Sequence, residues 1–249
     1  MRHRHTLHHR QHHREQRLVS LRRPLIAVLA TACLTAGLSA CADGADSPQN
    51  VTSSQKSTPV TCTTAPTPRA KDQALTLPDK KTAQGQVFIA KVETNCGTIT
   101  LELDGDKAPQ TVASFLQLAK GYYDDTPCHR FVPEFVLQCG DPTGTGQGGP
   151  GYTFGIENAP SDNQYPKGTL AMARQANNAD SNGGQFFITV ADTSIPADSA
   201  GGYTIFGKVV GGMDVVDHVA AAGAAAEDAN GNTAPNQPIS VLKISISKK

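Results

Sequence analysis

Short apolar runs recur along the chain from about Gln86 to the C-terminal end. Two of them, residues 87–93 and 98–103, are rich in Val, Ile, Phe and Leu and are separated by Asn95-Cys96-Gly97. A short polar link ending in glycine between two such runs is typical of a β-hairpin. The last apolar run, residues 239–247, alternates between two faces and predicts one more strand.

Five further apolar runs predict strands between this hairpin and the C-terminal strand. They cover residues 130–132, 135–139, 169–173, 185–190 and 203–210. Many strands of this length, separated by turns that contain Gly and Pro, favour a closed antiparallel barrel.

Two segments show helical spacing instead. In the first, Pro109 precedes apolar residues that recur from Val112 to Ala119, and Gly121 follows as a stop signal. The second covers residues 213–222. The pattern therefore predicts an all-β domain with two helices.

Residues 1–41 have the features of an export signal. They hold seven Arg and one acidic residue, and residues 25–38 form a largely apolar run. This run is short for a membrane span but suits a signal-peptide core. It ends in Leu38-Ser39-Ala40-Cys41, which resembles the lipoprotein box of bacteria and implies a lipid on the Cys41 sulfur. The alternatives are an uncleaved membrane anchor and a secretory signal with an unrelated Cys. We expect a protein held at the cell membrane by lipid and facing the extracytoplasmic side.

Residues 42–85 are rich in Ser, Thr, Pro, Ala, Asp and Gln, with few large apolar side chains. Such a segment buries too little apolar surface to offset its ordering entropy. It predicts a flexible tether between the anchor and a domain at residues 86–249. Beyond residue 41 the chain has 15 Lys and Arg against 21 Asp and Glu, a net charge of −6. This acidic balance argues against nucleic acid as a partner.

Four Cys remain once the signal and the lipid-bearing Cys41 are set aside: Cys62, Cys96, Cys128 and Cys139. An even number in an exported protein favours disulfides, and four Cys allow three pairings. Cys128 and Cys139 flank two runs that would pair as a hairpin, which brings these two Cys nearly opposite. We therefore expect a Cys128–Cys139 disulfide and a Cys62–Cys96 disulfide, the alternative being four buried thiols.

Three segments are specific enough to indicate a family: residues 128–141, 144–149 and 182–188, which read CHRFVPEFVLQCGD, GTGQGG and NGGQFFI. In this order they resemble the cyclophilins, and the resemblance covers residues 86–247. It implies an eight-stranded antiparallel barrel capped by two helices, and peptidyl-prolyl cis/trans isomerase activity on proline-containing polypeptides. A cofactor or metal ion is not expected, and a monomer is the default.

The chemistry of this reaction explains which residue types suffice. Amide resonance holds the X-Pro bond planar, with a rotation barrier of roughly 18–20 kcal/mol. No bond breaks, so a catalyst needs to grip the proline ring and bind the twisted amide more tightly than the planar one. A fixed guanidinium can do this, because it always carries charge and presents a rigid set of donors.

The resemblance assigns a role to ten residues of this sequence. The catalytic candidates are Arg130, Phe135, Gln138 and Gln185. The substrate-binding candidates are Val136, Gly146, Ala173, Arg174, Phe187 and Tyr203, with Ala173 and Arg174 acting through their main chain.

Some positions depart from the best-known cyclophilins. Arg174, Val136 and Tyr203 stand where those members have Asn, Met and His, the chain has no Trp, and the loop 191–202 is longer. We therefore expect only weak cyclosporin binding. The alternative function is a proline-peptide-binding module or holdase without catalysis.

Overall fold

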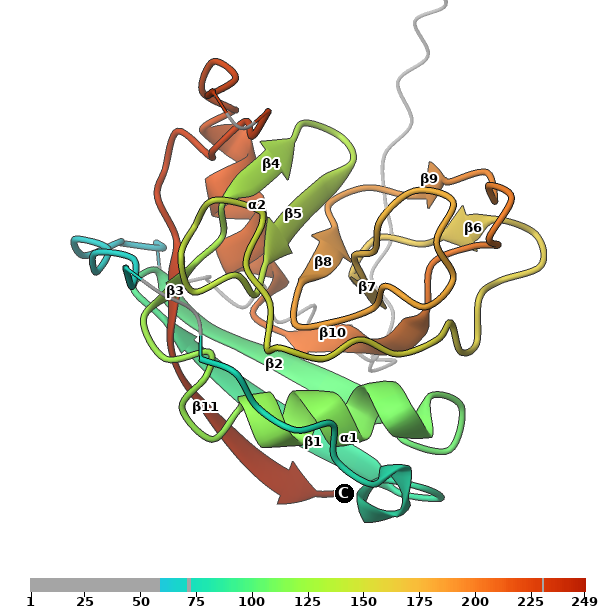
Figure 1. Ribbon diagram of the computed structural model, residues 1–249. Coiled ribbons are helices and arrows are strands. Elements are labelled where there is room, and N and C mark those ends of the chain that lie inside the picture. Colours follow the sequence, from blue (N-terminus) through green and yellow to red (C-terminus); the bar gives the residue numbers. More distant parts are fainter. Residues whose placement is uncertain (1–58, 71–72, 230) are drawn as a thin grey trace, which may run out of the picture. The chain divides into compact units, whose positions relative to one another are not determined.

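The computed structural model describes residues 59–70, 73–229 and 231–249 (Figure 1). The predicted signal segment, the lipidation site Cys41 and the first part of the predicted tether lie outside these residues. The strands are β1 (Val87–Thr94), β2 (Gly97–Asp104), β3 (Thr126–Pro127), β4 (Arg130–Val132), β5 (Val136–Cys139), β6 (Gln164–Tyr165), β7 (Thr169–Met172), β8 (Phe186–Thr189), β9 (Thr193–Ser194), β10 (Ile205–Gly211) and β11 (Ser240–Lys248). The helices are the short 3-10 helix η1 (Lys80–Thr82), α1 (Pro109–Leu118) and α2 (Met213–Ala221).

Nine of the strands form one antiparallel sheet in the order β3-β11-β1-β2-β10-β7-β8-β5-β4, and β6 pairs with β9 in a small second sheet. The all-β prediction with two α-helices is confirmed, and every predicted strand is present within two residues of its expected ends. The two-residue strands β3, β6 and β9 were not predicted. They lack the apolar run that identifies a strand in a sequence.

The predicted closed eight-stranded barrel is wrong, because the sheet curls without closing. Its edge strands, β3 and β4, are successive parts of the chain separated by Cys128 and His129. A two-residue link can join two paired strands, but these two edge strands do not pair with each other. Strand β3 pairs with β11, and β4 pairs with β5. Cys128 and His129 therefore link the two edges of the sheet covalently, and no ladder of hydrogen bonds between the edge strands closes the barrel.

Strands β1 and β2 form the predicted hairpin, with Thr94 paired to Gly97 across the turn. Gly97 has φ 129°, a conformation that favours glycine. On its other edge β2 pairs with β10, and here Gly207 approaches closely: an added Cβ would lie 2.3 Å from the carbonyl oxygen of Glu102. Glycine at position 207 therefore permits the contact between these strands.

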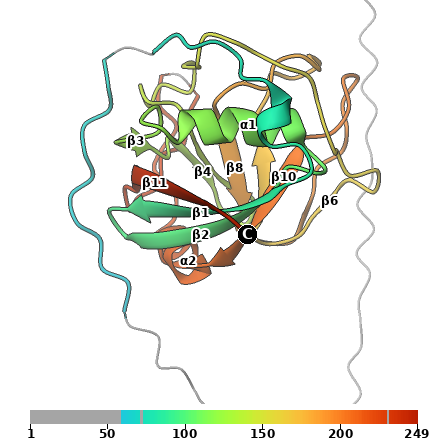
Figure 2. The same ribbon diagram turned by 90° about the horizontal axis from the view of Figure 1, so that it is seen from below.

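The two helices lie on opposite sides of the β1–β2 hairpin (Figure 2). Helix α1 begins with Pro109, which needs no hydrogen-bond acceptor there. The distant Glu157 carboxylate caps this helix, accepting from the main-chain N–H groups of Gln110 at 3.0 Å and Thr111 at 2.8 Å. Phe115 on the inner face of α1 packs into the buried core, with its ring centre 5.7 Å from that of Phe206.

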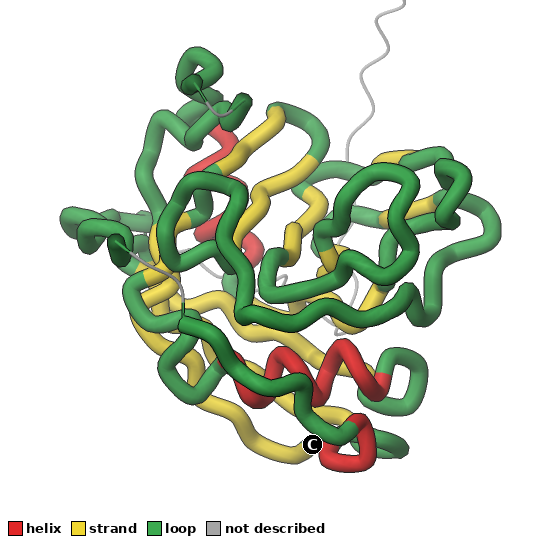
Figure 3. The backbone as a smooth tube through the Cα atoms, in the orientation of Figure 1, coloured by secondary structure: helices red, strands yellow, loops and turns green. Residues whose placement is uncertain are grey.

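The chain between β5 and β6 forms loops and turns, apart from one bridge at Phe154 (Figure 3). The structure contains both predicted disulfides, Cys62–Cys96 and Cys128–Cys139. Within the described ranges, no helix has the length and apolar character needed to cross a membrane.

Candidate active site

A pocket of about 250 Å³ opens at the end of the sheet where β4, β5, β8 and β7 lie next to one another. It brings together eight of the ten predicted site residues, and Ile195 completes its lining. The predicted residues in this lining are Arg130, Phe135, Val136, Gln138, Ala173, Arg174, Phe187 and Tyr203. The other two, Gly146 and Gln185, line an adjacent pocket of about 340 Å³ that shares Gln138, Ala173 and Arg174 with the first.

Strand register explains why these side chains meet. Gln138 on β5 lies opposite Arg130 on β4 and opposite Phe187 on β8. Residues at paired positions of neighbouring strands project to the same face. One row across three strands thus places a cation, an amide and an aromatic ring together at this end of the sheet.

The pocket floor is apolar and separate from the main core. Val136, Tyr165, Ala171 and Phe187 form a small buried cluster of their own. The Tyr203 ring meets Phe187 edge to face, with centroids 5.7 Å apart, which is a favourable arrangement for aromatic pairs. The result is a hydrophobic hollow suited to a small apolar ring.

A chain of hydrogen bonds fixes the polar side of the pocket. Arg130 Nη1 donates to Gln138 Oε1 at 3.3 Å, and Gln138 Nε2 donates to Gln185 Oε1 at 2.9 Å. Gln185 Nε2 donates in turn to the carbonyl oxygens of Gly146 at 3.1 Å and Gly148 at 2.9 Å. Each amide therefore has one orientation that satisfies both neighbours, and the guanidinium has a fixed acceptor.

The glycine-rich loop that supplies these carbonyls is ordered around one buried carboxylate. Asp141 is 0% exposed and accepts from the main-chain N–H groups of Thr143 at 2.8 Å, Gly146 at 2.7 Å and Gly148 at 3.0 Å. Burial alone would raise the pKa of Asp141, but the hydrogen bonds from Thr143 and Gly148 outweigh it and the pKa lies below its ordinary value. An ionised Asp141 thus holds the loop beside Gln185.

His129 lies behind the polar row and is 5% exposed. Its Nε2 is 3.5 Å from Gln138 Nε2. Burial lowers the pKa of His129, which favours the neutral ring, and a neutral ring can accept from the Gln138 amide. This contact supports the same amide orientation that presents Oε1 to Arg130.

The chain matches the family described as "Cyclophilin type peptidyl-prolyl cis-trans isomerase/CLD" over residues 89–246. It belongs to this family. Among curated relatives, "Probable peptidyl-prolyl cis-trans isomerase B" of Mycobacterium tuberculosis is 40% identical over 169 residues, which cover 61% of this chain and 53% of the relative. "Peptidyl-prolyl cis-trans isomerase-like 1" of Neurospora crassa is 46% identical over 129 residues, covering 50% of this chain and 76% of the relative. The chain thus spans about half the length of the mycobacterial protein.

The fold is also similar to a solved cyclophilin of Cryptosporidium parvum. That structure has a TM-score of 0.56 and 31% identity, and the match covers 66% of this chain and 99% of the other. A second structure of the same protein, determined in the presence of the dipeptide Ala-Pro, gives a TM-score of 0.55 and 32% identity, with 65% and 99% covered.

In the present chain, the side chain of Arg174 makes structural contacts that the sequence did not suggest. It is fully buried and forms a bidentate ion pair with Asp198, both N···O distances being 2.9 Å. The guanidinium carbon also lies 4.7 Å from the centre of the Tyr203 ring. The hydrogen bonds from Arg174 to Asp198 hold the pKa of this carboxyl group well below its usual range. Arg174 therefore fixes the loop 191–202 against the pocket wall.

Sequence reasoning missed three contributors to this cyclophilin pocket: Ile195, Asp198 and His129. Asp198 and Ile195 lie in the long loop 191–202, whose path no periodic pattern predicts. Strand alternation would place His129 on the opposite face from Arg130 and Gln138, so the predicted pairing did not indicate its contact with Gln138.

Proposed function

We propose that this cyclophilin is a peptidyl-prolyl cis/trans isomerase that acts on exported or cell-surface proteins. The observation that carries the proposal is the position of Arg130 on the lining of the apolar pocket that Phe135 and Phe187 also line. The Ala-Pro dipeptide present with the Cryptosporidium parvum cyclophilin agrees with a small apolar ring as the occupant.

The residues suit a reaction that needs no covalent step. The proline ring would sit on the apolar floor, and the main chain beside Ala173 would align the flanking peptide. As the X-Pro amide twists, its nitrogen loses resonance with the carbonyl and becomes a better hydrogen-bond acceptor. Arg130, held by Gln138, would donate more strongly to this twisted state than to the planar ones. Such a difference in binding lowers the barrier.

A protease-coupled assay on an X-Pro peptide tests the proposal with the full chain. Arg130→Ala removes the donor and leaves the apolar floor in place. Loss of one preorganised donor typically lowers kcat by about 10²–10³-fold, so we expect a fall of that order with a small change in KM. Lys120→Ala, which removes an exposed cation from the turn after α1, is the matched control and retains the wild-type rate.

A wild-type rate equal to the uncatalysed rate refutes the proposal. If the wild type still binds the peptide under those conditions, the chain is a proline-peptide-binding module.

The proposed location rests on the sequence of residues 1–41 and is tested separately. Cells that express the full chain are labelled with an alkyne-bearing fatty acid. The wild type takes up the label, and Cys41→Ala does not. Equal labelling of the two proteins, or no labelling of either, rules out the lipid at this position.

A further inference from the structure

A segment that precedes the region of family similarity lies along the domain and reaches the loop beside the active site. We call residues 59–70 and 73–78 the N-terminal strap; the family match begins only at residue 89. We propose that the strap supports catalysis by positioning the glycine-rich loop 142–150. Through this loop it also positions Arg130. This inference rests on the proposed isomerase function.

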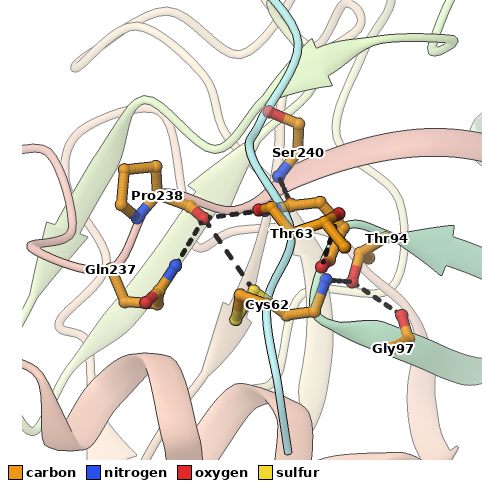
Figure 4. The surroundings of a disulfide bond; sticks show 9 residues. Cys62, Thr63, Thr94, Gly97, Gln237, Pro238 and Ser240 are labelled. Carbon is orange, nitrogen blue, oxygen red and sulfur yellow. Dashed lines mark hydrogen bonds between the residues drawn. A yellow bond between two sulfur atoms is a disulfide. The ribbon is translucent and has the colours of Figure 1, made fainter.

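The strap is anchored at its start to the turn of the β1–β2 hairpin (Figure 4). Cys62 forms its disulfide with Cys96 in that turn. Next to it, the Thr63 main chain and Asn95 exchange hydrogen bonds: Thr63 N–H donates to the Asn95 carbonyl at 2.8 Å, and Asn95 Nδ2 donates to the Thr63 carbonyl at 2.8 Å. The Asn95 Oδ1 atom accepts from the Ser240 N–H at 2.8 Å. One covalent bond and several hydrogen bonds therefore fix this end.

Further along, the strap holds both ends of the glycine-rich loop. The Arg69 N–H donates to the carbonyl of Pro142 at 2.9 Å, and the Leu75 N–H donates to the carbonyl of Pro150 at 2.7 Å. The Arg69 guanidinium donates to the Tyr122 carbonyl and lies 5.6 Å from the centre of the Tyr122 ring. Arg69 is thus held by a buried aromatic residue of the domain while its main chain holds the loop.

The strap has a second line of support on helix α1. Gln117 Nε2 donates to the Thr76 carbonyl at 2.8 Å, and Gln110 Nε2 donates to the Pro78 carbonyl at 2.9 Å. Prolines at positions 59, 66, 68 and 78 restrict the backbone before it docks. These features explain how a segment with few apolar side chains is held on the surface.

From the loop, hydrogen bonds continue to the catalytic candidate. The carbonyls of Gly146 and Gly148 accept from Gln185, which accepts from Gln138, which accepts from Arg130. A shift of the loop would remove the acceptors of Gln185 and release the amide pair that orients the guanidinium. Small displacements of a catalytic group lower rates strongly, because the geometry of the transition state is strict.

The test uses Arg69→Ala in the full chain, with Lys81→Ala as the matched control. Lys81 lies a few residues beyond the strap, carries the same charge and has an exposed side chain. We expect kcat to fall about tenfold in Arg69→Ala with KM almost unchanged, since the apolar floor is intact. Amide hydrogen exchange at Gly146 and Gly148 becomes faster in the same variant. Lys81→Ala matches the wild type in both measurements.

Wild-type kcat and wild-type exchange at Gly146 and Gly148 in Arg69→Ala would overturn the proposal. If Arg69→Ala does not fold, Arg69→Lys carries the test, because it keeps the charge and loses the planar fork. If the wild type itself has no isomerase activity, the proposed function fails. The exchange measurement then still decides whether the strap holds the loop.

Discussion

The two disulfides allow a quantitative test of what each contributes to stability. Cys62–Cys96 joins the N-terminal strap to the first hairpin, and Cys128–Cys139 joins the link between β3 and β4 to the end of β5. The perturbation is the replacement of each pair by alanine in separate variants. Alanine avoids a buried unpaired hydroxyl, since Cys96, Cys128 and Cys139 are all buried.

The expected magnitudes follow from the lengths of the closed loops. A cross-link removes conformational entropy from the unfolded chain, by a constant amount plus an amount that grows with the logarithm of the loop length. The separations are 34 residues for Cys62–Cys96 and 11 for Cys128–Cys139. At 25 °C the relation gives about 3.8 kcal/mol for the first and about 2.8 kcal/mol for the second. Losing the strap disulfide should therefore destabilise the domain by about 1 kcal/mol more.

Equilibrium urea unfolding, followed by far-UV circular dichroism, measures both differences. The double-pair variant, with all four Cys replaced, tests whether the two losses add, as expected for links that share no partner. The wild type with reductant is the control for effects of the alanines. An equal or larger loss for the Cys128–Cys139 variant would refute the loop-length reasoning. It would mean that lost packing near β4 and β5 outweighs chain entropy.

Two further predictions concern stability. Burial lowers the pKa of His129, so between its ordinary value of about 6.5 and its lower folded value the unfolded chain binds a proton that the folded chain does not. The free energy of unfolding therefore falls as pH decreases through this window. Urea titrations at several pH values should show that His129→Gln flattens the dependence of this free energy on pH. His218→Gln, at an exposed position, is the control and should keep that dependence. Gly207→Ala forces a Cβ to within 2.3 Å of the Glu102 carbonyl oxygen and should lower the free energy of unfolding by about 1–3 kcal/mol. Gly149→Ala, whose Cβ would meet no atom within 4 Å, should change it little, and equal midpoints for the two glycine variants would contradict this reasoning.

The sequence predicts the sheet well because each strand carries its own signal. Apolar runs such as residues 130–132 and 169–173 coincide with β4 and β7 to within one residue. Closure of the sheet carries no such local signal. It depends on whether the two edge strands lie side by side, and β3 is too short to appear in the pattern at all.

The candidate site was predicted in part for the same reason. Residues within the recognisable motifs, such as Arg130 and Phe187, project from strands, and strand register then fixes which of them meet. The ion pair between Arg174 and Asp198 joins two loops far apart in sequence, and the sequence alone does not show that they meet. A pattern that is periodic along the chain cannot report a contact that depends on the path of a loop.

The segment before the family match extends this argument to domain boundaries. A composition rich in Ser, Thr and Pro predicts a tether, because such residues bury little apolar surface. In the described part of that segment, however, main-chain hydrogen bonds, one disulfide and the Arg69 side chain hold the segment on the domain, and Val60 and Leu75 pack against the core. Cys62 was the single residue in this segment that indicated attachment. Where a polar segment contains a Cys and spaced prolines, its main chain should be considered part of the folded unit until a truncation shows otherwise.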